Sequence, residues 1–499
     1  MHIRRVSVAI ASTLVAYGGY HFATIGNNVT RLDSTKNYST PSASTSAPTR
    51  KALVVSADSI YTGSIEGDEP ISKYTDASGR RVIEMLSSDE ATAKLRQNEE
   101  SYFVGRGQGV VRYDVVQIPS NDPIEDDHSE KIVEMPQQSS DWMFWGVYDG
   151  HSGWSTSAKL RQTLINYVAR ELNTTYKSAA SPAGIPSPEA VQQAMKTGFN
   201  KLDYEICHES VEKTMKANSK TAAAELLAPA LSGACALLSF YDSKSKLLHV
   251  ACTGDSRAVL GRKSSNGKWV ATPLSIDQTG GNPDEAARLR KEHPNEPNVV
   301  RNGRILGGLE PSRAFGDAVY KWSRETGDLM KRSFFGKTQS GLLKTPPYVT
   351  AEPIVTSTEI SPENGDFLIL ATDGLWEMLT NEEVVGLVGQ WIEKQNAEAA
   401  SSKSSWFGMF GGGKKADGLP VEHTKTTITK GHNSDEAPIR QRQWGVEGKE
   451  MERFVVEDKN VATHLVRNAL GGKNKDMLCA LLTLPAPYSR RYRYVLPSP

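Results

Sequence analysis

The chain has 499 residues, enough to bury one large core or two ordinary ones. Lys plus Arg and Asp plus Glu both total 58, so the formal net charge is zero and we expect no nucleic-acid partner. Hydrophobic residues make up 38% and charged residues 23%, which is typical of a globular protein with some polar segments. The four cysteines include no C-x-x-C pair, which disfavours a zinc site or a disulfide framework.

The first 32 residues have a composition of their own. Arg4 and Arg5 are followed, over residues 6–30, by a stretch without Lys, Arg, Asp or Glu. Acid-poor starts that contain Arg and Ser are typical of organelle presequences, so we expect residues 1–32 to direct the chain to the mitochondrion. The apolar part, residues 6–22, is near the lower limit of about 17–25 residues for spanning a bilayer, which makes membrane attachment through the N-terminus an alternative. A leader that carries no address is the remaining alternative.

Residues 33–100 are predicted to be a low-complexity leader and connector, because residues 39–50 are rich in Ser, Thr, Pro and Ala. From residue 101 to residue 493, short apolar runs alternate with turn residues, and we expect one folded domain there. Residues 396–452 interrupt this pattern with Ser-rich and Gly-Lys runs, which predicts a mobile insertion.

Short apolar runs bounded by turn residues predict six strands. They cover residues 144–148, 233–241, 246–252, 257–261, 269–272 and 366–371. Residues 242–245 are suited to a hairpin turn between the second and third of these strands.

Two helices are predicted between the strands. Ser187 is suited to the N-cap of a helix that has Pro188 at its first position and runs to about Glu209. Asn381 is predicted to cap a second helix, which runs to about Gln395. Strands joined by hairpins, with helices grouped separately, favour an α+β fold of packed antiparallel sheets flanked by helices.

Acidic motifs lie at the turns and strand ends. They are residues 123–128 with Glu125 and Asp126, residues 148–153 with Asp149, Gly150 and His151, residues 253–257 with Asp255, residues 313–317, and residues 371–377 with Asp373 and Glu377.

Oxygen-rich motifs of this kind suit hard cations such as Mg²⁺ and Mn²⁺, which prefer carboxylate, carbonyl and water ligands. Two such ions about 3.5–4 Å apart can share a water and lower its pKa, so that it attacks phosphorus while a nearby acid protonates the departing oxygen. A single Asp-Gly pair is more often a plain turn. The order of the motifs along the chain, each at a strand end, favours a metal centre.

The set and order of these motifs resemble the protein phosphatase 2C family, from about residue 101 to residue 493. Residues 148–153 and 371–377 are specific to that family when they occur together, while residues 306–322 and 346–353 resemble its pyruvate dehydrogenase phosphatase branch. The resemblance implies two antiparallel sheets flanked by helices (αββα) and a metal-dependent protein serine/threonine phosphatase. It also implies a phosphoprotein substrate, with pyruvate dehydrogenase E1α as the candidate.

The resemblance also implies roles for single residues. His151 becomes the general acid, and Asn121 stands where many relatives carry a phosphate-gripping arginine, so it is expected to contact phosphate only weakly. The implied ligands of two Mg²⁺ or Mn²⁺ ions are Glu125, Asp126, Asp149, Gly150 and Asp373, and those of a third, weaker ion are Asp255 and Glu377.

The end of the chain departs from the family pattern. The family carries a terminal aspartate motif followed by an apolar strand, whereas residues 487–493 here lead into the atypical end 494–499 without either. The alternative reading is therefore a catalytically impaired phosphatase-fold protein that binds a phosphoprotein partner. Intact Glu125, Asp149, His151 and Asp373 argue against that reading.

Overall fold

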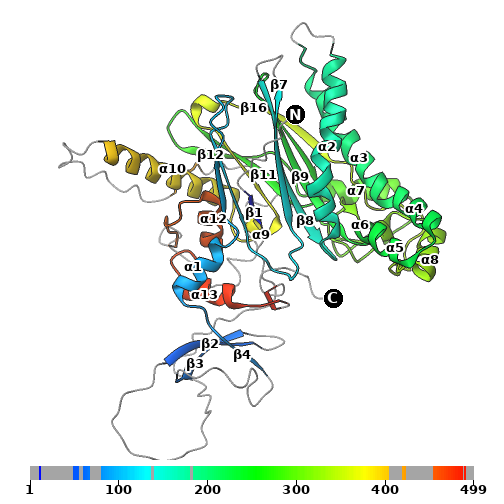
Figure 1. The fold of residues 1–499 in the computed structure, drawn as a ribbon, viewed down its shortest axis with the longest axis horizontal. Helices are drawn as coiled ribbons and strands as arrows, with labels where there is room; N and C mark the ends of the chain where they lie inside the picture. The colour runs from blue at the N-terminus through cyan, green and yellow to red at the C-terminus, as the bar shows by residue number, and fades with distance from the viewer. Residues whose placement is uncertain are drawn as a thin grey trace, which may run out of the picture.

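The computed structural model describes residues 10–12, 49–55, 60–67, 80–135, 140–179, 184–403, 419–422, 453–486 and 488–489. Two large sheets form its centre (Figure 1). The first sheet has the order β12 (Trp269–Pro273), β11 (Arg257–Lys263), β17 (Phe367–Ala371), β1 (Ile10–Ser12), β6 (Arg112–Gln117) and β5 (Glu100–Phe103). The second sheet has the order β16 (Ile354–Glu359), β10 (Leu247–Thr253), β9 (Gly233–Asp242), β8 (Ser140–His151) and β7 (Asp127–Met135), and β15 (Phe315–Gly316) also pairs with β9.

Neighbouring strands in both sheets are antiparallel except at β1. This short N-terminal strand lies between β17 and β6 and runs parallel to both. In the second sheet, β9 and β10 form a hairpin: they are joined by a tight turn and pair from Asp242 with Leu247 to Ala236 with Thr253.

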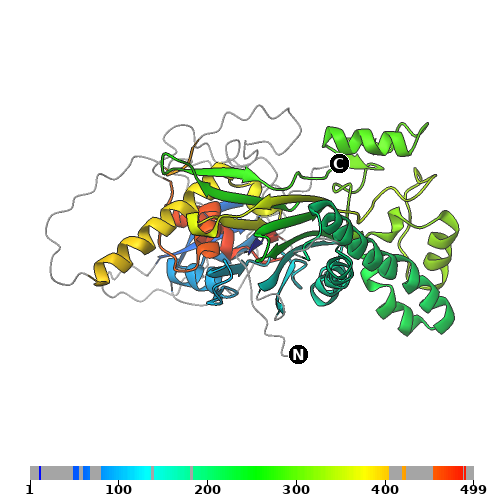
Figure 2. The same cartoon turned by 90° about the horizontal axis from the view of Figure 1, so that it is seen from above.

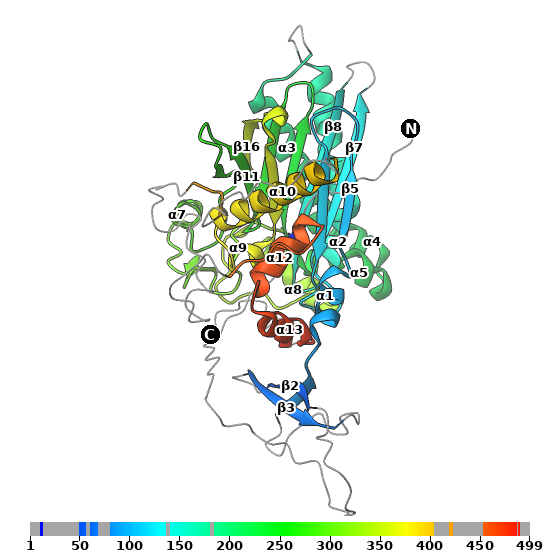
Figure 3. The same ribbon diagram turned by 90° about the vertical axis from the view of Figure 1, so that its left-hand side faces the viewer.

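Helices cover the outer face of each sheet. Helices α2 (Ser155–Lys177) and α3 (Pro188–Tyr204) pack on the second sheet, and α10 (Asn381–Lys403) and α12 (Val461–Leu470) pack on the first. Figure 2 shows the four layers from above, and Figure 3 shows α10 and α12 lying across the face of the first sheet. The expected αββα sandwich is confirmed.

Smaller elements connect these layers. They are α1 (Ser88–Arg96), a π-helix (Glu205–Glu209), α4 (Ser210–Ala217), α5 (Lys220–Leu226), α6 (Ala228–Leu231), α7 (Pro283–Glu292), β13 (Val300–Arg301), β14 (Arg304–Ile305), α8 (Arg324–Ser333), α9 (Asp373–Trp376), α13 (Lys475–Thr483) and two 3₁₀ turns (Ala318–Tyr320 and Pro362–Asn364).

Three apolar cores hold the layers together, and strand β8 contributes to two of them. Phe144 and Tyr148 point into the core under α2 and α3, whereas Met143, Trp145 and Val147 point into the core between the sheets. Since successive side chains of a strand point to opposite faces, a strand buried on both faces is apolar throughout. This explains why β8, β9, β10, β11 and β17 could be predicted from short apolar runs alone.

The two helix predictions had different outcomes. Ser187 caps α3 as predicted, with its side chain accepting a hydrogen bond from the Ala190 N–H at 3.3 Å. The predicted cap at Asn381 is wrong, because Thr380 and Glu383 form a capping box with reciprocal bonds of 3.0 and 3.2 Å. Asn381 is buried and its Oδ1 accepts a hydrogen bond from Arg257 at 3.0 Å.

The predicted connector at residues 33–100 contains more structure than its composition indicated. Strands β2 (Thr49–Val55), β3 (Ile60–Glu66) and β4 (Arg81–Glu84) form a three-stranded sheet, which Figure 1 shows below the sandwich. Helix α1 follows and contacts α13. The low-complexity composition is confined to residues 39–50, whereas β2 has a buried run from Ala52 to Val55 that can pair and pack.

The predicted insertion at residues 396–452 also begins differently, since α10 continues through residue 403. At residues 419–422 the chain returns to the first sheet, where Val421 bridges to Trp269. Residues 404–418 and 423–452 lie outside the described residues, as do 1–9, 13–48 and 490–499, which include most of the predicted leader and the atypical end. Within the described residues, no helix has the length and apolarity needed to cross a membrane.

Candidate metal centre and active site

Three aspartates from different strand ends converge at one edge of the sandwich. Asp149 lies near the end of β8, Asp255 lies in the bend between β10 and β11, and Asp373 begins α9 directly after β17. Each offers a carboxylate oxygen, and these oxygens all lie within 4.8 Å of one another. Carboxylates gathered this closely from both sheets are suited to a hard divalent cation.

Gly150 allows the segment before β7 to approach β8. A Cβ at Gly150 would overlap the carbonyl oxygen of Glu125 and lie 2.8 Å from the Ser157 Oγ. The Ser157 hydroxyl donates to that same carbonyl at 2.5 Å. The backbone of Glu125 is therefore held directly against β8, beside Asp149.

The side chain of Glu125 is fixed by two donors. The Gly153 N–H donates to its Oε1 at 2.7 Å, and the Asn121 amide donates to its Oε2 at 2.5 Å. We expected Asn121 to contact phosphate weakly. Its amide instead donates a hydrogen bond to Glu125. Asp126 follows directly, and its charge raises the pKa of Asp149.

Burial and mutual repulsion shape the electrostatics of this centre. Burial and then the charges of Asp126, Asp373 and Asp255 raise the pKa of Asp149 well above its ordinary value. The pKa of Asp373 is also raised well above its ordinary value, first by burial and then by the charge of Asp255. The pKa of Glu377 is raised in the same way, first by burial and then by the charge of Asp373.

Two carboxylate oxygens at the centre lack partners. Among the described residues, nothing hydrogen-bonds to the buried Asp373 Oδ1 or to the buried Glu377 Oε2. Buried polar atoms normally have a partner, and leaving one without costs about 1–3 kcal/mol. A divalent cation would satisfy these oxygens and offset the repulsion, so the residues present fit Mg²⁺ or Mn²⁺.

His151 follows this centre on β8 and is 9% exposed. Its Nε2 lies 2.6 Å from the Oδ2 of Asp317. Burial acts to lower the pKa of His151, but the charge of Asp317 and the hydrogen bond to it outweigh burial, so the pKa is raised. The imidazole is therefore biased toward the protonated form, which can donate a proton.

Sequence reasoning missed three acidic residues near the centre. Asp317 lies in a motif that was noted without assigning this residue a role. The charges of Glu310 and Asp277 raise the pKa values of Asp373 and Glu377, although neither residue belongs to a motif that includes a predicted ligand. Only their spatial position reveals them, because neither residue lies in a strand or directly at a strand end.

Next to the centre, a second buried carboxylate is fully paired. Glu285 on α7 accepts from Arg313 at 2.7 and 3.0 Å, from Ser312 at 2.6 Å and from Arg288 at 2.7 Å. Burial opposes this, but these partners lower the pKa of Glu285 to about 2. Ser312 and Arg313 thus hold the 313–317 segment in place.

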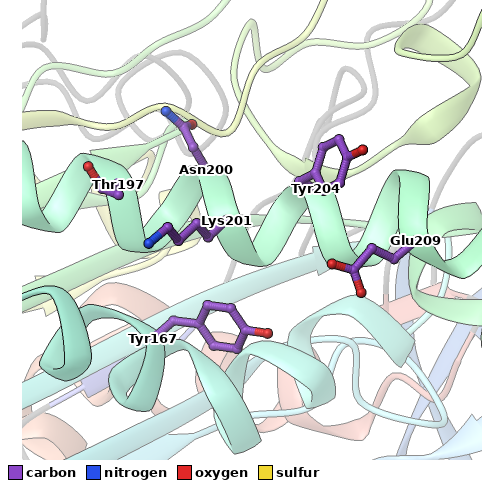
Figure 4. A pocket seen from close by; sticks show the side chains of 6 residues that line it. All are labelled: Tyr167, Thr197, Asn200, Lys201, Tyr204 and Glu209. Carbon is purple, nitrogen blue, oxygen red and sulfur yellow. The ribbon is translucent and has the colours of Figure 1, made fainter.

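A surface cavity of about 460 Å³ lies elsewhere, over α2, α3 and the π-helix, and is lined by Tyr167, Thr197, Asn200, Lys201, Tyr204 and Glu209 (Figure 4). Lys201 pairs with Glu171 at 2.7 Å, and Glu209 pairs with Lys213 at 3.0 Å. These charges are already matched by neighbours, so the cavity has no group prepared for chemistry.

Comparison with known proteins agrees with this geometry. The model of the family described as Protein phosphatase 2C matches residues 120–408, more than half of the chain. A protein phosphatase 2C homolog of Schizosaccharomyces pombe is 44% identical over 427 residues, covering 85% of this chain and 87% of that protein.

Two further relatives carry a more specific name. The mitochondrial pyruvate dehydrogenase (acetyl-transferring) phosphatase 1 of Saccharomyces cerevisiae is 43% identical, covering 82% of this chain and 71% of that protein. The human protein of the same name is 30% identical, covering 82% of this chain and 81% of that protein.

Among solved structures, the serine-threonine phosphatase 2C of Toxoplasma gondii aligns with a TM-score of 0.36 and 18% identity, over 56% of this chain and 84% of that chain. The family assignment rests instead on the family model and on the sequence relatives. The chain belongs to the protein phosphatase 2C family of metal-dependent protein serine/threonine phosphatases.

Proposed function

We propose that this phosphatase dephosphorylates serine or threonine in the E1α subunit of pyruvate dehydrogenase, in the mitochondrion, with two Mg²⁺ or Mn²⁺ ions and a third, weaker one. The observation that carries the metal assignment is the convergence of Asp149, Asp255 and Asp373 within 4.8 Å. Unpartnered buried oxygens on Asp373 and Glu377 support it, because a non-catalytic binding protein gains nothing from their repulsion.

The resemblance to the family supports specific ligands. Asp149, the Gly150 carbonyl, Glu125 and Asp126 would help to hold the two ions. Asp373 would hold the first ion from the opposite sheet, while Asp255 and Glu377 would hold the third. When bound, the ions supply positive charge for the phosphate and lower the pKa of water to near neutrality.

His151 would supply the proton. As water oxygen bonds to phosphorus, the bond from phosphorus to the seryl or threonyl oxygen breaks, and that oxygen takes a proton from the imidazole. A serine alkoxide is a poor leaving group without this proton, whereas nitrophenolate leaves readily. His151→Gln should therefore slow a phosphoserine peptide much more than p-nitrophenyl phosphate.

The substrate proposal comes from the relatives named pyruvate dehydrogenase phosphatase in yeast and human. It is tested by Mn²⁺-dependent phosphate release from phosphorylated pyruvate dehydrogenase E1α and from a phosphoserine peptide with the same residues in scrambled order. Faster release, as kcat/KM, from E1α supports the proposal. Equal values for the two substrates would contradict it, while activity on both would leave the phosphatase assignment intact.

The mitochondrial location rests on the names of these relatives and on the acid-poor start of the chain. A fluorescent fusion of residues 1–60 should enter mitochondria, and Arg4→Glu with Arg5→Glu should abolish entry. Alkaline carbonate extraction then distinguishes a matrix form, which is released, from one attached to the inner membrane. Diffuse cytosolic fluorescence of the unmodified fusion would refute the targeting role.

A further inference from the structure

The His151 imidazole has one nitrogen engaged and one free. Nε2 lies 2.6 Å from Asp317 Oδ2, whereas no group among the described residues hydrogen-bonds to Nδ1. The side chain of His151 keeps 11% of its surface exposed, and that of Asp317 keeps 7%. A hydrogen bond from one ring nitrogen sets which nitrogen remains available to a substrate.

Gly233 on β9 provides the space for this pair. Its backbone is in register with His151 on one side and with Gly316 on the other. A Cβ at Gly233 would overlap both His151 Nε2 and Asp317 Oδ2. The contact between histidine and aspartate thus exists only because this strand position has no side chain.

Asp317 adopts a costly backbone conformation to reach the histidine. Its φ is +48°, in the left-handed region that non-glycine residues rarely adopt, and the preceding Gly316 has a φ of +68°. The Asp317 N–H donates to the Ser232 carbonyl at 2.8 Å. Strained residues that surrounding contacts hold in place are concentrated at functional sites.

An ion pair between Asp203 and Lys321 supports the turn at Gly316 and Asp317. Asp203 on α3 accepts from the Gly316 N–H at 3.0 Å and from Lys321 Nζ at 2.6 and 2.8 Å. The Cys207 thiol, on the π-helix that follows α3, donates to the Gly316 carbonyl at 3.4 Å. The support ends at the backbone of Gly316, so the carboxylate of Asp317 is left to face His151.

We propose that Asp317 is a positioning residue that holds the His151 ring through Nε2, so that Nδ1 is the nitrogen that gives its proton to the departing seryl or threonyl oxygen. The proposal rests on the proposed role of His151 and adds the residue and the ring atom through which that role is exercised. Asp317 acts through its contact with His151.

Asp317→Asn tests this, since asparagine has the same shape and tolerates positive φ but carries no charge. General acid catalysis typically contributes 10²–10⁴-fold, so we expect kcat on a phosphoserine peptide to fall by about 10- to 100-fold. On p-nitrophenyl phosphate we expect a loss below about threefold, because that leaving group needs no proton. The Mn²⁺ concentration for half-maximal activity should stay unchanged.

The decisive measurement is the double variant. If Asp317 acts through His151, adding Asp317→Asn to His151→Gln should cost no further activity on the peptide. Losses that multiply in the double variant would overturn the proposal. If His151→Gln slowed both substrates equally, the general-acid role would fail, while non-additivity would still show that Asp317 acts through His151.

Two further variants separate positioning from folding. Asp203→Asn removes a half-buried charge under the same turn without touching His151, so it should lower the melting temperature while slowing the peptide less than Asp317→Asn does. Circular dichroism first checks that Gly233→Ala is folded. The folded variant should lose much more turnover on the phosphoserine peptide than on p-nitrophenyl phosphate, as Asp317→Asn does. A folded Gly233→Ala protein with unchanged peptide turnover would contradict the requirement for this contact.

Discussion

Two groups of buried carboxylates in this protein have opposite kinds of neighbours and opposite pKa shifts. The carboxylate of Glu285 is surrounded by Arg313, Arg288 and Ser312, and its pKa falls to about 2. Asp149 and Asp373 are surrounded by other acids, and their pKa values rise well above the ordinary range. Both groups are buried, so burial alone does not distinguish a structural carboxylate from a functional one.

The distinction lies in the partners. A buried charge with matched donors stabilises its surroundings or is neutral, whereas buried like charges without counterions destabilise the fold. A cluster of buried like charges is tolerable when a bound group from outside the chain supplies the opposite charge. Here the chemistry of the oxygens indicates a divalent cation, and the phosphatase family to which the chain belongs depends on Mg²⁺ or Mn²⁺.

The largest expected effect comes from removing one carboxylate of the metal cluster. Asp149→Asn should lower phosphate release by about a thousandfold or more, because metal charge stabilisation is worth several kcal/mol and about 1.4 kcal/mol is tenfold. Without metal, the Asp149→Asn variant should not melt at a lower temperature than the unmodified protein, since the repulsion between the carboxylates is relieved. Phosphopeptide assays with Mn²⁺ and calorimetry in EDTA check both points.

The control for this variant is Glu292→Gln, which changes a half-exposed carboxylate on α7 that pairs with Arg288. It should leave both turnover and melting temperature close to those of the unmodified protein. A folded Asp149→Asn protein with near-normal turnover would refute the metal assignment.

The opposite result is expected from the paired carboxylate. Glu285→Gln leaves the buried Arg313 without its counterion, and breaking such a pair costs about 3–5 kcal/mol of unfolding free energy. Urea unfolding measures this loss. Turnover per folded molecule should fall far less than in Asp149→Asn. If unfolding is unaffected while turnover collapses, the division between structural and functional carboxylates does not hold.

The pH dependence of the two groups should differ in sign. Glu285 has a lowered pKa, so its contribution is complete above its ordinary value of 4.5 and is lost as pH falls toward about 2. Asp149 and Asp373 have raised pKa values, so in the metal-free protein their contribution to stability is most favourable below their ordinary value of 3.8 and is lost as pH rises.

Melting curves in EDTA between pH 4 and pH 8 test the trend for the two aspartates, and curves between pH 2 and pH 5 test the trend for Glu285. Asp149→Asn should reduce the decline at rising pH by at least about 2–4 °C, the shift that ~1 kcal/mol gives in a large domain. Added Mn²⁺ should raise the melting temperature more at pH 7.5 than at pH 5, because the ligands must be deprotonated. A Mn²⁺ effect that does not depend on pH would contradict the raised pKa values.

The smallest expected effect concerns one hydrogen bond to Glu285. Ser312→Ala removes the hydroxyl that donates at 2.6 Å, while both arginines remain. We expect a loss of about 1.5 kcal/mol in urea unfolding, the lower end of the range for a hydrogen bond to a charged group. A loss as large as that of Glu285→Gln would mean that the hydroxyl, rather than the arginines, is the main partner.

Six of the sandwich strands and the main acidic motifs could be predicted from the sequence, whereas β5, β6, β7 and β16 were not predicted. Strands such as β9 and β17 lie between two cores, so both of their faces are apolar and a short run identifies them. Edge strand β7 is only partly buried along its whole length, which left no such run, and it was not predicted. Asp149, Asp255 and Asp373 were found because each lies at a strand end within a motif.

The groups that complete the site are brought together by long-range packing. Asp317 is 166 residues from His151 in the chain, and the cradle at Gly233 exists because β9 lies between β8 and β15. Asn381 matches a helix cap locally, yet Thr380 takes that position while Asn381 receives a hydrogen bond from Arg257, 124 residues away. Local preference selects among nearby partners, whereas long-range packing chooses between side chains that are equally suitable in sequence.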